Sequence, residues 1–261
     1  MRHPFFSSTR PLVFAHRGGS ALAPENTIAA FDNGLALGAD GLELDVHLSR
    51  DGRVVVHHDR TLDRTTNLHG AIDGFAADEL ARADAGYHFQ PDAGWPFRGQ
   101  GITVPTLASV LARYRDIPIV IEMKVNSPDL ARASVDVIRA ADAVDRVCLA
   151  SFGLHVLRAT RALEPAIATS AARGEVRWAL YRSRCRWPVS RVTYAGYQVP
   201  EISGNARVVS TRFVKDAHCR GLGVHVWTVD AAPDARRLLQ WGVDGLITDR
   251  PDLIVPVCRP S

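Results

Sequence analysis

Pairs of charged residues and histidines stand at the ends of short apolar segments in this chain of 261 residues. They are His16 and Arg17, Glu43 and Asp45, and Glu122 and Lys124. Side chains alternate along a strand, so Glu43 and Asp45 share one face of theirs. Carboxylates that meet at one end of a sheet repel each other unless a cation lies between them. We therefore expect one divalent ion, Mg²⁺ or Ca²⁺, bound by Glu43, Asp45 and Glu122, because carboxylate oxygens suit hard cations.

A second histidine reaches these carboxylates through a predicted β-hairpin of residues 41–58. The linking residues 49–52 are too few for a parallel crossover, so the two strands must be antiparallel neighbours. If the turn is the two residues 51 and 52, Asp45 faces His58. If the loop is all four residues 49–52, Glu43 faces His58. Either register brings His58 to the carboxylates.

Two histidines beside a metal ion suit acid–base chemistry. His16 and His58 can serve as general base and general acid near neutral pH. The metal ion, Arg17 and Lys124 can stabilise negative charge on a phosphoryl group. The residues therefore favour a reaction at phosphorus.

The elements that would hold these residues alternate along most of the chain. Apolar, β-branched segments predict parallel strands at 12–15, 41–48, 119–123, 146–150, 166–170, 194–199, 224–229 and 245–248. Helical patterns lie between them at 25–37, 106–114, 128–141, 154–163, 211–220 and 233–241, with an arginine-rich helical segment after residue 173. Eight parallel strands joined by helices are expected to close as a (β/α)8 TIM barrel with its active site at the strands' C-terminal ends. We predict one domain over residues 1–261, with a small capping insertion at about 61–104.

Composition narrows the class of protein. With 46% hydrophobic and 23% charged residues the chain can build one sizeable core, and its net charge of +3 is too small to indicate nucleic acid as a partner. The four cysteines show no CxxC pairing, which argues against a zinc site or a disulfide scaffold. The N-terminal residues lack the apolar core of a signal peptide, and no run of about 20 apolar residues follows. We therefore expect a cytoplasmic protein; its oligomeric state is not predicted.

Five sequence blocks resemble the glycerophosphodiester phosphodiesterase family. They are AHRGGSALAPENT at 15–27, GLELDVHLSRDGRVVVHHDRTLDRTT at 41–66, IEMK at 121–124, VWTVD at 226–230 and GVDGLITDRP at 242–251. The resemblance implies a barrel with an inserted capping segment, His16 and His58 as catalytic acid and base, and Glu43, Asp45 and Glu122 as metal ligands. It implies further that Arg17 and Lys124 contact the phosphate and that Trp227 contacts the alcohol or glycerol part. The implied reaction hydrolyses a glycerophosphodiester to sn-glycerol 3-phosphate and an alcohol.

Several of these assignments have alternatives. Strand alternation alone does not decide between His57 and His58, whereas the family pattern of a histidine directly before Asp59 favours His58. Lys124 can be a counter-ion of Glu122, and Trp227 can be a core residue. Residues 25–27 fit a helix cap and turn, with orientation of the catalytic loop as the alternative for Glu25 or Asn26.

The segment from Arg173 to Arg191 matches no family motif. Its arginines and aromatic residues fit either a solvated helix whose long side chains cover apolar surface, or a patch that contacts a membrane surface or an anionic partner. The second reading keeps a lysophospholipase D-type enzyme of the same superfamily as the alternative function. A binding barrel without catalysis would lack one of the acid–base or metal positions, and a zinc hydrolase would need more histidine ligands, so both are less favoured.

Overall fold

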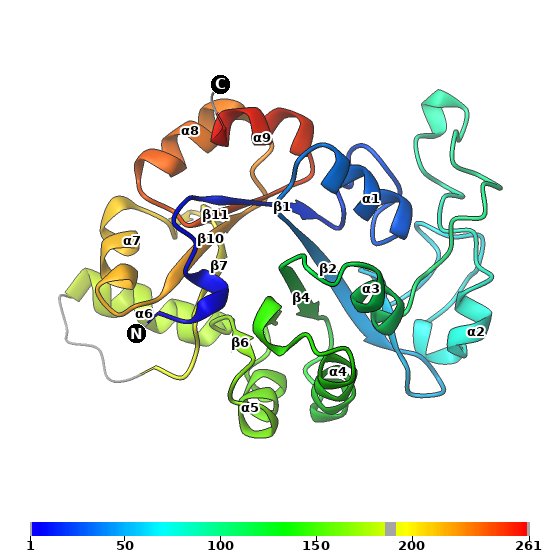
Figure 1. Ribbon diagram of the computed structural model, residues 1–261, viewed down its shortest axis with the longest axis horizontal. Helices are drawn as coiled ribbons and strands as arrows, with labels where there is room; N and C mark the ends of the chain where they lie inside the picture. Colours follow the sequence, from blue (N-terminus) through cyan, green and yellow to red (C-terminus); the bar gives the residue numbers. More distant parts are fainter. Residues whose placement is uncertain (1, 186–191, 260–261) are drawn as a thin grey trace.

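The computed structural model describes residues 2–185 and 192–259, and within them eight parallel strands curve into a nearly closed barrel (Figure 1). The sheet order is β6-β5-β4-β2-β1-β11-β10-β7. The strands are β1 (Leu12–His16), β2 (Gly41–Leu48), β4 (Ile119–Met123), β5 (Val147–Ala150), β6 (Ala168–Thr169), β7 (Gly196–Pro200), β10 (Gly223–Trp227) and β11 (Gly245–Thr248). A parallel bridge between Ser170 and Gly196 joins the two outer strands. The predicted TIM barrel is confirmed.

Helices surround the strands in Figure 1. They are α1 (Ile28–Ala36), α3 (Leu107–Arg113), α4 (Pro128–Ala140), α5 (Leu154–Leu163), α6 (Arg173–Cys185), α7 (Thr211–His218), α8 (Ala232–Gln240) and α9 (Pro251–Cys258). Hydroxyl caps fix several starts: Thr27 accepts from Ala30 N–H and Ser210 accepts from Phe213 N–H. The sequence did not predict α9, nor the short hairpin of β8 (Ile202–Ser203) and β9 (Ala206–Arg207).

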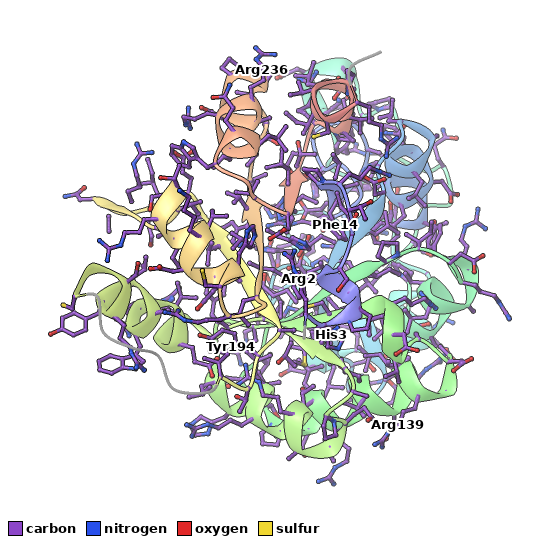
Figure 2. All side chains as sticks on the ribbon, turned by 60° about the vertical axis from the view of Figure 1, so that its left-hand side comes forward. Arg2, His3, Phe14, Arg139, Tyr194 and Arg236 are labelled. Atoms are coloured by element: carbon purple, nitrogen blue, oxygen red, sulfur yellow. The ribbon has the colours of Figure 1, made fainter. Side chains whose placement is uncertain are left out.

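Phenylalanines fill the barrel interior. Phe14 is fully buried, and Phe5 and Phe6 of the 3-10 helix η1 (Pro4–Phe6) pack against it. Figure 2 shows Phe14 inside the molecule, whereas Arg139 and Arg236 extend from helices at its edge. A Cβ at Gly223 would lie within 2.8 Å of Phe6, so a larger residue there would displace this packing. Aromatic side chains thus fill the interior around Phe14.

The hairpin register differs from both sequence alternatives. β3 (Val54–Val56) is antiparallel to β2, with Leu48 opposite Val54 and Val46 opposite Val56. Ser49 N–H donates to the Arg53 carbonyl at 2.9 Å, which leaves a three-residue loop at 50–52. Gly52 has φ of 75°, the left-handed conformation that such a loop requires. Neither the two-residue turn nor the four-residue loop forms.

The segment 61–104 packs beside this hairpin, in cyan and green at the edge of Figure 1. It contains η2 (Ile72–Gly74), α2 (Ala77–Leu80) and η3 (Pro91–Ala93), so each of these helical segments is only three or four residues long. Leu62, Ile72, Leu80 and Val104 form a small apolar cluster with Val55 of β3.

The arginine-rich segment begins as α6, and its residues 186–191 lie outside the described part of the chain. Among the described residues, no helix has both the length and the apolar character needed to cross a membrane.

Candidate active site

Adjacent strands bring the acidic residues together. Asp45 of β2 and Glu122 of β4 are register partners, and His16 of β1 is the partner of Glu43. One oxygen from each of Glu43, Asp45 and Glu122 lies within 4.8 Å of the others. Glu43 and Asp45 are buried, at 5% and 1% exposure. The predicted convergence of the three carboxylates is therefore present at the C-terminal ends of the strands.

The electrostatics of this cluster favour a cation. Burial, together with repulsion from Asp45, raises the pKa of Glu43 to about 8. Burial also raises the pKa of Glu122. Burial acts to raise the pKa of Asp45 as well, but Lys124 and Arg17 lower it. The Lys124 Nζ lies 3.3 Å from Asp45 Oδ1 and 3.4 Å from Glu122 Oε1. Oxygen-only donors this close together fit a hard divalent ion.

Asn26 holds Asp45 in place. Its side-chain amide donates to Asp45 Oδ2 at 2.9 Å, and its Oδ1 accepts from Asp45 N–H at 3.1 Å. Asn26 has φ of 59° in the loop before α1, a conformation that asparagine tolerates better than most residues. This loop residue therefore orients a carboxylate, which the sequence offered only as an alternative to helix capping.

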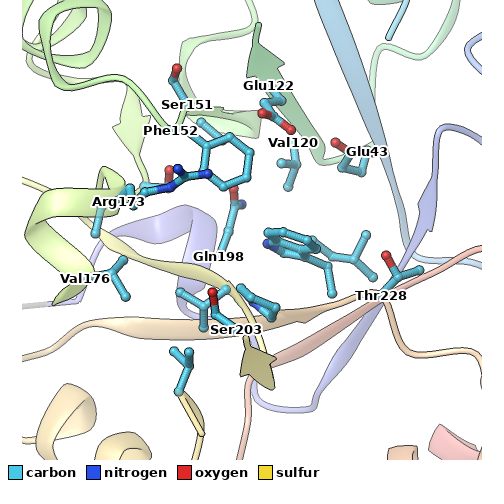
Figure 3. Close-up of a pocket in the computed structure, with 18 of the residues that line it drawn as sticks. Glu43, Val120, Glu122, Ser151, Phe152, Arg173, Val176, Gln198, Ser203 and Thr228 are labelled. Atoms are coloured by element: carbon cyan, nitrogen blue, oxygen red, sulfur yellow. The ribbon is translucent and has the colours of Figure 1, made fainter. Parts of the chain in front are cut away.

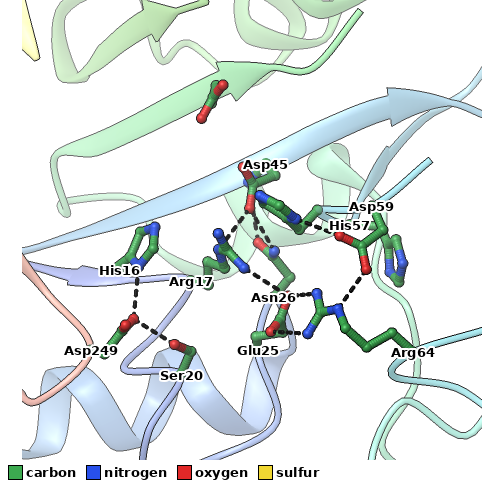
Figure 4. Close-up of polar contacts among 12 residues, drawn as sticks. His16, Arg17, Ser20, Glu25, Asn26, Asp45, His57, Asp59, Arg64 and Asp249 are labelled. Carbon is green, nitrogen blue, oxygen red and sulfur yellow. Dashed lines mark hydrogen bonds and ion pairs between the residues drawn. The ribbon is translucent and has the colours of Figure 1, made fainter. Parts of the chain in front are cut away.

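Arg17 links the same loop to the cluster (Figure 4). Its backbone N–H donates to Glu43 Oε2 at 3.1 Å, while its guanidinium lies 3.3 Å from Asp45 and donates to Glu25 at 3.1 Å. The backbone of Arg17 is left-handed, with φ of 50°. Gly18 follows with φ of 89°, and a Cβ there would lie 2.6 Å from Ala30. Only glycine fits this turn, which aims the Arg17 N–H at Glu43.

Asp249 orients His16. The Nδ1 of His16 lies 2.7 Å from Asp249 Oδ1, and its Nε2 lies 3.7 Å from Glu43 Oε2. Burial acts to lower the pKa of His16, but Glu43 and Asp249 raise it to about 9. Ser20 donates to the same Asp249 oxygen. Sequence reasoning assigned no role to Asp249, although it lies directly after strand β11 inside the block GVDGLITDRP.

His58, and not His57, faces the site. The ladder ends at Val56 and the chain bends at 58–60, so this bend and not the strand register directs His58. Its Nδ1 lies 2.6 Å from Asp59 Oδ1. His57 is buried with its Nε2 3.2 Å from the Thr61 carbonyl.

An ionic chain supports this second histidine (Figure 4). Arg64 donates to Asp59 at 2.5 Å and to Glu25 at 2.7 Å. Burial acts to raise the pKa of Asp59, but Arg64 and His58 hold it well below its usual range. Asp59 is therefore ionised and bonds to His58 as Asp249 bonds to His16. The insertion contributes Arg64 to this arrangement.

A pocket of about 690 Å³ opens above these groups (Figure 3). Among the described residues, the predicted site residues that line it are His16, Arg17, Glu43, His58, Glu122, Lys124 and Trp227. The Trp227 ring meets Phe152 edge to face, with centroids 6.0 Å apart. The structure therefore brings the predicted residues to one pocket, with the buried Asp45 beside the two glutamates.

One face of α6 forms another wall of the pocket. Arg173, Val176, Arg177 and Leu180 line it at the i, i+3, i+4, i+7 spacing of a helical face. Sequence reasoning missed this role, although the spacing itself could have indicated it. Trp178 and Tyr181 do not line the pocket and are 54% and 52% exposed.

Comparison with known proteins identifies the family. Residues 16–253 match the model of the Glycerophosphoryl diester phosphodiesterase family. A glycerophosphodiester phosphodiesterase of Caldanaerobacter subterraneus is 33% identical over 257 residues, which are 96% of this chain and 98% of the relative. One of Bacillus altitudinis is 33% identical over 252 residues, or 94% and 97% of the two chains.

Solved structures share the fold. A phosphodiesterase of Oleispira antarctica, solved in complex with the product sn-glycerol-3-phosphate, matches with a TM-score of 0.76 and 29% identity, covering 97% of this chain and 98% of that one. A glycerophosphoryl diester phosphodiesterase domain of Mycobacterium tuberculosis matches with a TM-score of 0.82 and 22% identity over 93% and 97%. On the family match and the extent of these identities, the chain belongs to the glycerophosphoryl diester phosphodiesterase family.

Proposed function

We propose that this protein hydrolyses a glycerophosphodiester to sn-glycerol 3-phosphate and an alcohol. The observation that carries the proposal is the meeting of the carboxylate cluster with His16 and His58 at one pocket. The relatives named above are phosphodiesterases of this type, and the Oleispira enzyme was solved with that product.

The activity is proposed to depend on one divalent ion, Mg²⁺ or Ca²⁺, held by Glu43, Asp45 and Glu122. Support comes from three oxygen donors within 4.8 Å of one another and from the raised pKa of the buried Glu43. When bound, such an ion would polarise a phosphoryl oxygen and neutralise charge in the cluster. The ligand set contains no thiolate or imidazole, which favours these hard ions over zinc.

The histidines are proposed to move protons. A glycerophosphodiester carries its own nucleophile, the glycerol hydroxyl beside the ester. One histidine would accept that proton as the oxygen attacks phosphorus, and the other would protonate the departing alcohol. A cyclic glycerol phosphate would result, and water would open it with the two histidines in exchanged roles. Each ring has one nitrogen on a carboxylate, Asp249 or Asp59, which fixes the other nitrogen for transfer.

Arg17 and Lys124 would hold phosphoryl oxygens. Both line the pocket, and both already lie against Asp45, so their positive charge stays next to the metal ligands. The 3.4 Å contact between Lys124 Nζ and Glu122 also supports Lys124 as a counter-ion of Glu122, and the two roles are compatible. Trp227 would bind the alcohol or glycerol part with Phe152 beside it.

The test is release of glycerol 3-phosphate from several glycerophosphodiesters, measured with and without excess chelator. Release that chelator abolishes, and that Mg²⁺ or Ca²⁺ restores, supports the proposal. Full activity in excess chelator would refute the proposed metal requirement. If no glycerol 3-phosphate is released from any diester, the proposed function is refuted.

A lysophospholipase D-type activity is the second candidate. The observation that favours it is the apolar part of the α6 wall, Val176 and Leu180, next to the exposed Trp178 and Tyr181. The rings of Trp178 and Tyr181 are stacked, with centroids 5.7 Å apart. Such a pair beside arginines suits weak contact with an anionic membrane surface, for which the segment from Arg173 to Arg191 was predicted.

Vesicle co-sedimentation at low and high salt tests the membrane contact, with neutral vesicles as the control. Absence of binding to anionic vesicles at low salt would contradict it.

The single domain over residues 1–261, with its insertion at about 61–104, and the cytoplasmic location remain predictions from the sequence.

A further inference from the structure

Two parts of the pocket lining carry different charged residues. Its acidic lining residues, among those the structure describes, are Glu43 and Glu122 of the carboxylate cluster. The charged residues of the α6 wall are Arg173 and Arg177. Figure 3 shows Arg173 beside Phe152, across the pocket from Glu43. The pocket thus has a mixed catalytic end and a purely cationic wall.

The cationic wall has no acidic partner of its own. The Arg173 guanidinium lies over the Phe152 ring, 4.8 Å from its centroid. Within residues 2–185 and 192–259, the ion pairs of the structure include neither Arg173 nor Arg177. Two like charges one helical turn apart repel each other, so an anion between them is favourable. Arginine binds carboxylate and phosphate through paired N–H donors, which suits an oxyanion in particular.

Gln198 of β7 adds an unused polar group. Both its Nε2 and its Oε1 are buried, and neither has a hydrogen-bond partner among the described residues. Burying an amide without partners is unfavourable, so a ligand that reaches it is favoured. Gln198 lines the same pocket and appears near Phe152 in Figure 3. It offers one donor and one acceptor to hydroxyl or amine groups of a ligand.

We propose that Arg173, Arg177 and Gln198 form a subsite for the alcohol part of the substrate, and that the preferred alcohol carries an oxyanion, either a carboxylate or a phosphate. This rests on the proposed function. Arg17, Lys124 and the proposed divalent ion would serve the phosphodiester at the other end of the pocket, so the α6 arginines are left for a second negative group. A cationic alcohol such as choline would be disfavoured there.

Matched substrates test the preference. Glycerophosphoserine differs from glycerophosphoethanolamine by a carboxylate, and glycerophosphoinositol 4-phosphate differs from glycerophosphoinositol by a phosphate. We expect kcat/KM to favour the anionic member of at least one pair by about tenfold, the size of a charge-assisted hydrogen bond at an exposed site. The pair that shows the preference tells which oxyanion is recognised.

The double variant R173Q/R177Q should bring that ratio close to one, chiefly through KM. The double variant R132Q/R158Q makes the same charge change at exposed positions of α4 and α5 that do not line the pocket, and should keep the wild-type ratio. Because both substrates are assayed on one preparation, partial unfolding of a variant cancels in the ratio. Q198L should raise KM for all of these diesters, since the amide serves hydroxyl and amine groups.

Three results would overturn the subsite. They are a wild-type ratio near one in both pairs, an unchanged ratio in R173Q/R177Q, or an equal loss of preference in R132Q/R158Q. Better turnover of a lysophospholipid than of any of these diesters would assign the α6 wall to an acyl chain instead. If no diester releases glycerol 3-phosphate, the proposed function itself fails; activity without preference refutes only the subsite.

Discussion

His16 and Asp249 lie 233 residues apart in the sequence, and their side chains meet at 2.7 Å. Strands β1 and β11 are parallel neighbours, so the residues that follow them arrive at the same edge of the sheet. The carboxylate fixes which nitrogen of His16 faces the pocket and favours the protonated ring.

Replacing Asp249 with Asn should therefore lower kcat by about 10²-fold, the usual scale for a disturbed general acid or base. The pKa of His16 should also fall, because Asp249 helps to raise it. The limb of the pH–rate profile that belongs to His16 should move to lower pH. An unchanged profile would mean that Asp249 does not act through His16.

Both histidines that we propose as proton-transfer groups should be required. His16→Ala and His58→Ala should each reduce kcat/KM by about 10²-fold or more, because each removes one proton-transfer group. His57→Gln is the matched control, since His57 bonds to the Thr61 carbonyl away from the pocket. It should stay within a few-fold of wild type. Loss of activity in H57Q with retention in H58A would reverse the assignment.

The carboxylate cluster should destabilise the fold when no metal ion is bound. A carboxyl with a raised pKa opposes folding once it ionises, and Glu43 has a pKa of about 8 against an ordinary 4.5. In chelator, the contribution of Glu43 to wild-type stability should fall as pH rises from 4.5 through 8, and Glu43→Gln should have the higher melting temperature at pH 8. Added Mg²⁺ or Ca²⁺ should raise the wild-type melting temperature by on the order of 3–10 °C.

Asp45→Asn should lose that metal-dependent rise, because it removes a buried ligand. Differential scanning fluorimetry over a series of pH values measures both effects without reference to activity. Equal metal stabilisation of wild type and D45N would show that the ion binds elsewhere.

The nucleophile can be identified with a deoxy substrate. An analogue that lacks the glycerol hydroxyl next to the ester should bind but be cleaved far more slowly, since the cyclic route needs that oxygen. Competitive inhibition of the natural diester by the analogue checks that it binds. Normal turnover of the analogue would show that water attacks the diester directly.

His225 should make the fold sensitive to acid. It is 1% exposed between Phe5, Phe6 and Phe14, and burial lowers its pKa from 6.5 to about 4. Between pH 6.5 and 4, His225 is protonated in the unfolded chain but stays neutral in the folded state. The free energy of unfolding therefore decreases as pH falls from 6.5 to 4. The total is about 3.5 kcal/mol at roughly 1.4 kcal/mol per pH unit.

Urea denaturation of His225→Gln at pH 7 and pH 4.5 measures this contribution. The variant should lose less stability on acidification than the wild type. His155→Gln, at an exposed position of α5, should behave as the wild type does. A difference between H225Q and wild type that is the same at both pH values would refute the titration.

Local sequence patterns were enough to predict the barrel and the convergence of its charged residues. Alternation of side chains placed Glu43 and Asp45 on one face of β2, and the regular exchange of strands and helices indicated the barrel. The charged residues at strand ends then had to converge, because parallel strands present their C-terminal ends at one mouth. These conclusions need only short-range periodicity and the handedness of the chain.

Tertiary structure alone decided the contacts that periodicity does not encode. Asp249 reaches His16 only when β11 closes beside β1, and Arg64 reaches Asp59 and Glu25 only when the insertion packs on the hairpin. The bend after Val56 directs His58, and not His57, to the pocket. The packing of α6 places Arg173 and Arg177 in the pocket lining. Each of these depends on a bend or on packing between distant segments, whose geometry is set by the whole barrel and not by the residues on either side.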